Sequence, residues 1–258
     1  ASFQSGAVSY LYYADRLYQI TLAVAGIAVG TVILPELSKK IKLNNYKLAQ
    51  DLQSRSINLC LFISLPAAVG LYVASYDIVN ALFGYGSFTE ASVKNTSDAL
   101  KFFAIGIPAF ALLKIFSSFY FARNNTQTPF HLSAIVVVIN LALSIYLFRI
   151  IGFIAIPIAT TISTWIIIFA YIFKFVEKDI HKFDNIFFRK IIKMFLSSAL
   201  MAIFLIYMIS FLADKLIYDS SLKILYLFLI VGLSIVVYFL ISVLIGSIKF
   251  GRKKSIII

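Results

Sequence analysis

Residues 11–35 read LYYADRLYQITLAVAGIAVGTVILP, and this stretch decides the fold. It is almost wholly apolar and long enough to cross a bilayer as a helix, yet Asp15 and Arg16 stand side by side in its first third. A charge inside a spanning run is costly and is a functional-site hypothesis by default. The apolar run begins near Val8, so Arg16 lies roughly 12 Å into the helix at ~1.5 Å per residue. This depth favours a binding role over the alternative, in which both charges anchor a helix end at the membrane surface.

The composition is that of an integral membrane protein. The chain has 258 residues, of which 61% are hydrophobic and 13% are charged, and its mean hydropathy is +0.95. The apolar runs are continuous rather than alternating, which indicates helices and not a β-barrel. The formal net charge of +12 falls in the gaps between these runs, so membrane topology explains it better than nucleic-acid binding does.

Hydropathy predicts seven spanning helices. They cover about residues 5–37, 57–74, 100–121, 130–148, 153–175, 194–212 and 224–248. The first is long enough to tilt, bend or break, and Gly26, Gly30 and Pro35 are the places where it could do so.

The connections carry their own signals. Residues 38–56 predict a short amphipathic helix at the membrane surface, whose apolar side is Leu43, Leu48 and Leu52. Thr89 with Ser92 is a candidate helix cap. Pro129 suits the first turn of the fourth span.

The distribution of basic residues predicts the orientation. Sixteen of the 23 Lys and Arg residues lie in alternate connections on one side, and five lie on the other. The richer side should be cytoplasmic. The N-terminal end of the sequence is then periplasmic and the C-terminus cytoplasmic, with Arg16 and Lys114 as the two cations left inside spans.

These two cations are the candidate binding residues. Few acids lie inside the spans to neutralise them, and neighbours such as Asp15 and Arg16 point about 100° apart on a helix, so they need not pair. Two uncompensated cations that face a shared cavity would attract an anion. The planar fork of arginine suits phosphate and diphosphate oxygens, and Lys114 would add a point charge. The alternative for Lys114 is a side chain that snorkels to the membrane interface.

Enzyme chemistry finds little support. The sequence has no carboxylate pair within a span, no His-rich helix, no phosphate-binding glycine loop and no nucleophile beside a base. A single cysteine, Cys60, excludes an internal disulfide and a cysteine-based metal cluster. His131 and His181 lie at predicted helix ends without a second ligand at metal spacing. We therefore expect neither an enzyme nor a metal or cofactor site.

Prolines interrupt three of the predicted spans, at Pro66, Pro108 and Pro157. Broken helices often line the binding site of a transporter, although a single proline is more commonly a packing kink. Buried cations and interrupted helices together indicate a transporter for a substrate with an anionic head.

Four stretches carry a family resemblance. They are SGAVSYLYYADRLYQ (5–19), GIAVGTVILPELSK (26–39), LFGYGSFT (82–89) and GIPAFALLKIFSSFYFARNNTQTP (106–129). Together they resemble the MurJ (MviN) family of lipid II flippases, within the superfamily that also holds multidrug antiporters and polysaccharide flippases. The resemblance covers residues 5 to about 143, and the later spans match in hydropathy and spacing.

The resemblance implies an all-α, MATE-like fold of fourteen membrane helices in two bundles around a central cavity that opens alternately to either side. The seven spans here would be its last seven. Residues 1–187 would form the C-terminal bundle, and residues 188–258 an additional two-helix region with a lipid groove and a basic tail. Where the family has Pro-x-Gly, residues 21–23 read Thr-Leu-Ala, so the bend there should be milder or fall at Gly26. The stretch NNTQTP also lacks the acid common before this turn.

The resemblance implies that Arg16 binds the diphosphate of the lipid, that Lys114 supports a cationic cavity, and that Asp15 belongs to the same substrate site. The expected function is translocation of the undecaprenyl-diphosphate-linked peptidoglycan precursor, lipid II, across the bacterial cytoplasmic membrane. The expected partners are this lipid, membrane lipids and an N-terminal bundle. The alternatives are another flippase or exporter of the superfamily, for an O-antigen-type lipid or a drug, and a non-transporting membrane scaffold for cell-wall enzymes.

Overall fold

A computed structural model describes residues 6–23, 28–177, 185–218, 220, 222–247, 249–250 and 256–257. The helices in these ranges are α1 Ala7–Leu22, α2 Ala28–Lys42, α3 Tyr46–Val73, α4 Ser75–Phe83, α5 Glu90–Phe121, α6 Gln127–Ile151, α7 Ala155–Glu177, α8 Asn185–Phe211 and α9 Lys223–Leu244. Short 3₁₀ turns occur at η2 Gly152–Ile154 and η3 Ala213–Lys215. Near the C-terminus, β1 Lys249–Phe250 pairs antiparallel with β2 Ile256–Ile257.

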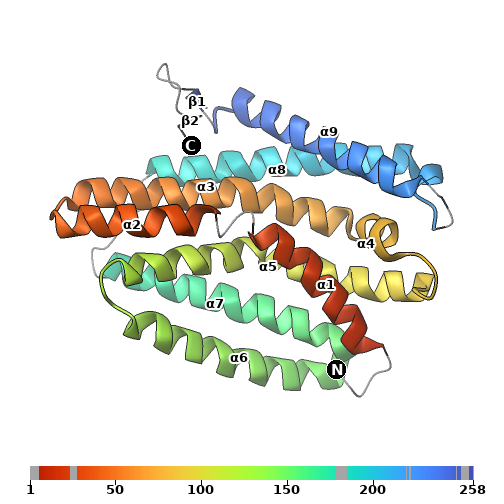
Figure 1. The fold of residues 1–258 in the computed structure, drawn as a ribbon, viewed down its shortest axis with the longest axis horizontal. Coiled ribbons are helices and arrows are strands. Elements are labelled where there is room, and N and C mark those ends of the chain that lie inside the picture. The colour runs from red at the N-terminus through yellow and green to blue at the C-terminus, as the bar shows by residue number, and fades with distance from the viewer. Residues whose placement is uncertain are drawn as a thin grey trace.

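The long helices lie side by side in one bundle (Figure 1). The packed neighbours follow the order α6, α7, α5, α3, α8 and α9. Helices α1 and α2 lie against α3 and α5. This arrangement confirms the predicted all-α membrane fold.

Five stretches of the described residues are long and apolar enough to cross a membrane. They correspond to predicted spans two to seven, because one of them, Gln127–Glu177, contains both α6 and α7. The chain reverses between these two helices at Gly152, whose φ of 68° is in the left-handed region that glycine adopts most readily.

Two described helices, α1 and α2, cover the first predicted span. In Figure 1, α1 begins near the N-terminus at one end of the bundle, and α2 finishes at the other end. Whether the helix breaks stays a prediction, because residues 24–27 between the two helices are not among the described residues. Gly26 lies outside the described residues, and Pro35 lies inside α2 instead of ending it.

The predicted surface helix over residues 38–56 is wrong as a separate element. Residues 38–42 finish α2, and α3 already begins at Tyr46 and continues into the second span. The turn between them uses a positive φ of 55° at Asn44, and the side chain of Asn45 caps α3 by accepting from Leu48 N at 3.3 Å. No proline or glycine follows before Pro66, so the helix has no reason to stop at the span boundary.

The other two local signals are confirmed. Thr89 Oγ1 accepts a hydrogen bond from Ser92 N at 3.3 Å and caps α5. Pro129 lies in the first turn of α6, where its missing N–H leaves no intrahelical bond unmade.

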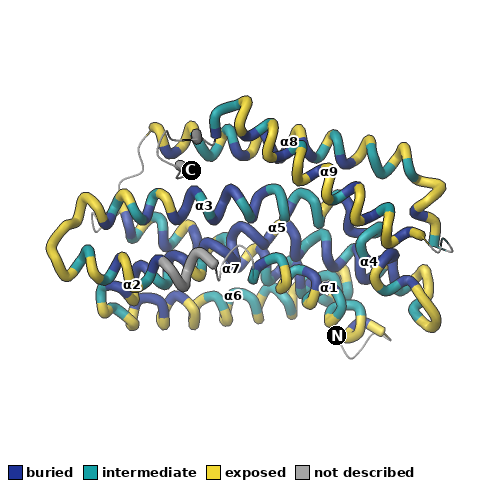
Figure 2. The backbone as a smooth tube through the Cα atoms, turned by 45° about the horizontal axis from the view of Figure 1, so that its top comes forward, coloured by how far each residue is buried: buried dark blue, intermediate teal, exposed yellow. Residues whose placement is uncertain are grey.

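Helix α5 is the centre of the bundle, and Figure 2 shows buried residues concentrated on it and its neighbours. Two side chains of α7 donate hydrogen bonds to backbone carbonyls of α5. Thr161 Oγ1 donates to Phe102 O at 2.8 Å, and Trp165 Nε1 donates to Ile105 O at 3.2 Å. Both hydrogen bonds attach the middle of α5 to α7.

Candidate functional site

Arg16 lies on the exposed face of α1. Its guanidinium carbon is 4.8 Å from the ring centroid of Tyr12, one turn earlier in the helix. An aromatic face attracts and orients a cation without removing its charge. Arg16 is therefore held by its neighbour and still presents its positive charge outward.

Asp15 does not neutralise Arg16. Its carboxylate accepts a hydrogen bond from Gln19 Nε2, four residues later, and across the described ranges the structure shows no ion pair between Asp15 and Arg16. The separation of about 100° between neighbours on a helix explains this. The prediction that the two need not pair is confirmed.

The opposite face of α1 fixes the helix to α5. Ala14 and Leu17 are buried. The ring of Tyr18 stacks on Phe103 at 4.7 Å between centroids and lies 5.4 Å from the ring of Phe110. This aromatic packing holds the backbone that carries Arg16, so the position of the guanidinium is set by α5.

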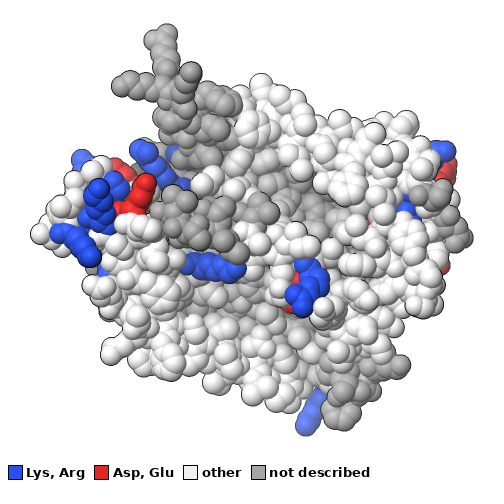
Figure 3. All heavy atoms as spheres, viewed as in Figure 1, with Lys and Arg blue, Asp and Glu red and all other residues white. Residues whose placement is uncertain are grey.

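Lys114 lies on α5, the same helix that supports α1, and its side chain is exposed. The residues next in the helix, Ile115 and Phe116, are buried. Both predicted cations are thus on exposed surfaces of this chain, and neither lines the large groove described below. In Figure 3, basic groups stand apart on a largely uncharged face over the middle of the bundle.

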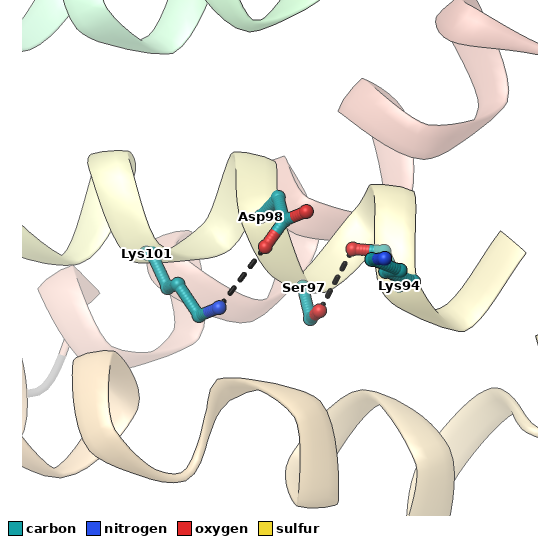
Figure 4. Close-up of polar contacts among 4 residues, drawn as sticks. All are labelled: Lys94, Ser97, Asp98 and Lys101. Carbon is teal, nitrogen blue, oxygen red and sulfur yellow. Dashed lines mark hydrogen bonds and ion pairs between the residues drawn. The ribbon is translucent and has the colours of Figure 1, made fainter. Parts of the chain in front are cut away.

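Another lysine of α5, Lys101, is paired with an acidic side chain and so contrasts with Lys114. Lys101 Nζ lies 3.0 Å from Asp98 Oδ1, one turn away, and Ser97 Oγ donates to Lys94 O at 2.8 Å (Figure 4). This is the one ion pair between side chains that the described ranges show. Lys114, farther along the helix, has no such acidic partner among the described residues.

An apolar groove of about 420 Å³ runs between α3 and α9. Helices α1, α4 and α8 each contribute one residue to it. Its lining residues are Thr21, Phe62, Ile63, Pro66, Ala67, Gly70, Leu71, Ile78, Met201, Val231, Ser234, Ile235, Tyr238 and Phe239. The hydroxyl of Ser234 donates within its own helix, to Ile230 O at 2.8 Å, so this residue adds little free polarity to the groove.

Sequence reasoning missed Tyr238. Its hydroxyl donates to Phe62 O at 2.8 Å, from α9 to α3. Phe62 is four residues before Pro66, and a proline has no N–H for the carbonyl four residues earlier. Pro66 was the available signal, because its position predicts a carbonyl that needs an outside donor.

Sequence reasoning also missed Lys223, which it counted as a surface residue of a short connection. The side chain is fully buried at the start of α9. Its Nζ donates to Asn80 Oδ1 at 3.2 Å, Gly84 O at 2.7 Å and Tyr218 O at 2.6 Å. The ammonium also lies 4.1 Å from the ring centroid of Tyr85. Oxygen and aromatic partners together make this burial possible.

The chain matches a protein-family model described as lipid II flippase MurJ over residues 1–227. A Rhizobium tropici protein described as "Probable lipid II flippase MurJ" is 34% identical over 253 residues, which is 97% of this chain and 48% of the relative. A Rhizobium meliloti protein with the same description is 42% identical over 166 residues, or 64% of this chain and 31% of the relative.

A solved structure titled "Lipid II flippase MurJ, inward closed conformation" superposes with a TM-score of 0.78 at 26% identity. The match covers 94% of this chain and 48% of the solved chain. The chain thus spans about half the length of the relative from Rhizobium tropici and of the solved structure.

Proposed function

The chain belongs to the lipid II flippase MurJ family, and we propose that it forms one half of a transporter that moves lipid II from the inner to the outer leaflet of the bacterial cytoplasmic membrane. The other half is an N-terminal bundle, and the two together are called the complete transporter below. The chain is a multi-pass membrane protein. We propose that its basic end faces the cytoplasm, following the positive-inside rule.

The observation that supports this function best is the state of Arg16. The guanidinium is exposed, held against Tyr12 at 4.8 Å and not paired with Asp15. It stands on α1, and we propose that the helix carrying it is interrupted between α1 and α2, the two described parts of the first predicted span. Interrupted helices often form transporter sites near the membrane midplane. A guanidinium in such a place binds two diphosphate oxygens at once.

Lys114 and Asp15 complete the proposed site. Lys114 raises the positive potential of the cavity that the two bundles enclose. Asp15, held by Gln19, lies beside Arg16 in sequence and presents carboxylate oxygens to hydroxyl or amide donors of the head group. Charge of both signs suits a substrate that joins a diphosphate to sugars and a peptide.

The groove between α3 and α9 is the proposed place for the undecaprenyl tail. Its lining is almost wholly apolar, and Thr21 at its edge belongs to α1, five residues after Arg16. Five helical residues rise about 7.5 Å, so a lipid bound at Arg16 has the groove within reach. Residues 188–258, which include most of α8 and all of α9, would then supply one wall of the tail groove, and residues 1–187 would supply the α3 wall and the residues that bind the head.

Transport would follow from rocking of the two bundles about this site, as alternating access requires. No group on the chain makes or breaks a bond in this scheme, so we propose a transporter and not an enzyme.

The direct test is binding of radiolabelled undecaprenyl diphosphate to the complete transporter in lipid nanodiscs. Arg16→Ala should weaken binding about tenfold or more, because a charge-assisted bidentate contact is lost. Arg16→Lys should keep part of it. The matched control is Arg149→Ala, which removes an exposed arginine at the end of α6. If the protein is a drug exporter, any binding of the probe should not depend on Arg16. If it is a scaffold, the probe should show no specific binding.

A further inference from the structure

Helix α9 is attached to the rest of the bundle at two separate points. At its first residue, Lys223 reaches oxygens of α4 and of the segment beyond it. At Tyr238, the hydroxyl reaches α3. Fifteen residues separate the two, which is about 22 Å along a helix. Val231 and Ile235 lie between them and line the groove, and Tyr238 is itself part of the lining.

The Tyr238 attachment is specific to one carbonyl. Phe62 O has lost its ordinary intrahelical donor, because Pro66 takes the position that would supply it. The hydroxyl at 2.8 Å replaces that donor. In an apolar setting an unpaired carbonyl is costly, so α9 is favoured in the one position from which Tyr238 reaches Phe62. The rings of Phe62 and Tyr238, 5.1 Å apart, reinforce it.

The Lys223 attachment joins three parts of the chain. Its ammonium bonds Asn80 in α4, Gly84 at the end of that helix, and Tyr218 before α9. Asn80 is itself tied to the α8–α9 connection, since its Nδ2 donates to Leu216 O at 2.9 Å. Moving a buried ammonium away from these oxygens costs much free energy, because the charge would be left unpaired. This end of α9 is therefore fixed against α4.

We propose that Tyr238 and Lys223 are positioning residues that set the width of the α3–α9 groove and thereby select a long polyprenyl chain as its occupant. The proposal rests on the proposed function, because it concerns how the tail of the lipid is held. Neither residue is assigned to the diphosphate.

The first test measures the groove without any lipid ligand. Spin labels are placed at Tyr72 on α3 and Leu233 on α9, both exposed, in the complete transporter after its cysteines, including Cys60, are replaced. Pulsed electron resonance should give a narrow distance distribution for the parent and a broader, longer one for Tyr238→Phe and for Lys223→Met. The control variants Tyr226→Phe on α9 and Lys215→Met in η3 should match the parent.

The second test distinguishes binding of the lipid tail from binding of the diphosphate head. Undecaprenyl diphosphate and dimethylallyl diphosphate, whose five-carbon chain cannot fill the groove, are bound to the same proteins. Tyr238→Phe and Lys223→Met should weaken the long-chain probe about threefold to tenfold, the equivalent of one modest interhelical hydrogen bond, and leave the short probe unchanged. Arg16→Ala should weaken both probes.

The outcomes distinguish the two proposals. If the parent fails to bind the long-chain probe, or binds it independently of Arg16, the proposed function fails. If parent binding depends on Arg16 but both positioning variants keep the parent distance distribution and long-chain affinity, the positioning role is wrong. Equal weakening of both probes also overturns it, because that result indicates general damage. Tyr238→Phe retains the aromatic ring, so it remains informative if Lys223→Met does not fold.

Discussion

The phenolic hydroxyl of Tyr238 on α9 supplies the hydrogen bond that Phe62 O on α3 cannot receive from within its own helix, across 2.8 Å. Pro66 lacks the backbone N–H that would otherwise donate to this carbonyl. The two residues that form the replacing bond are 176 positions apart in the sequence. A kink in one helix thus fixes the place of another, and the groove lies beside both.

This relationship predicts an energetic coupling between Tyr238 and Pro66. In the complete transporter, Tyr238→Phe should lower the free energy of unfolding by about 1 kcal/mol, the scale of interhelical hydrogen bonds in membranes. In a Pro66→Ala background the same change should cost less, because the substituted residue has a backbone N–H that can donate to Phe62 O. Reversible unfolding in mixed detergent measures the cycle. An equal cost in both backgrounds would show that the hydroxyl acts elsewhere.

The groove predicts a difference between two glycines. A Cβ at Gly70 meets nothing within 4 Å, and neither does one at Gly232, but only Gly70 lines the groove. Gly70→Leu should fill the groove and reduce undecaprenyl diphosphate binding about tenfold, with the fold intact, because the added side chain occupies space proposed for the tail. Gly232→Leu is the matched control, and its affinity should equal that of the parent. Equal affinities of the parent, Gly70→Leu and Gly232→Leu for the probe would show that the tail does not bind in this groove.

The close packing of α5 against α7 predicts that substitution of Gly106 destabilises the fold. A Cβ there would lie 2.6 Å from the ring of Phe110 and 2.8 Å from Thr161 Oγ1, the hydroxyl that bonds Phe102 O. Gly106→Ala should therefore destabilise the fold by about 1–3 kcal/mol, as overpacking does. The measurement is the apparent melting temperature of the complete transporter in detergent, with Gly232→Ala as the variant expected to leave it unchanged or raise it. An unchanged melting temperature for Gly106→Ala would contradict the close packing.

Asp77 predicts a pH dependence. It lies in α4, outside the candidate spans, and burial raises the pKa of its carboxyl above the usual value. The folded state then binds this proton more tightly than the unfolded chain does, so the free energy of unfolding falls as pH rises through the interval between the unfolded and the folded pKa. Asp77→Asn should remove this fall and be more stable than the parent at neutral pH.

The measurement for Asp77 is the free energy of unfolding across the acidic range, for the complete transporter and its Asn variant. The comparison protein is Asp214→Asn, which changes an exposed carboxylate in η3. Parallel curves for the parent and Asp77→Asn would mean that burial of this carboxyl has no energetic consequence.

Much of the fold follows from local sequence. Apolar runs of about twenty residues predict membrane helices because a bilayer imposes that length, and six of the seven predicted spans correspond to single long helices in the structure. The caps at Thr89 and the start at Pro129 were predictable because their chemistry involves only the next few residues.

The errors have physical causes. Residues 38–56 show amphipathic spacing, but a helix continues wherever nothing stops it, and the polar start of α3 leads directly into its apolar part. Lys223 reads as a surface charge because its partners Asn80 and Gly84 are about 140 positions away. The acceptor of Tyr238 is equally remote. Contacts of this kind depend on the packed bundle, which a linear pattern does not contain.

The site was predicted unevenly. Arg16 was identified by charge and depth, and the structure adds its contact with Tyr12 and its independence from Asp15. The roles of Arg16, Lys114 and Asp15 in binding stay predictions. The groove was expected from the family resemblance, and its lining residues are evident only from the packing of α3 against α9.

The most direct test of the central claim is rescue of bacteria depleted of their own lipid II flippase. The complete transporter is expressed beside its Arg16→Ala, Arg16→Lys and Arg149→Ala forms at matched membrane levels, and growth and cell shape are scored. We predict that the parent and Arg149→Ala rescue, that Arg16→Lys rescues weakly, and that Arg16→Ala fails. Full rescue by Arg16→Ala would contradict the account, because Arg16 would then be an anchor or a packing residue and not the diphosphate contact.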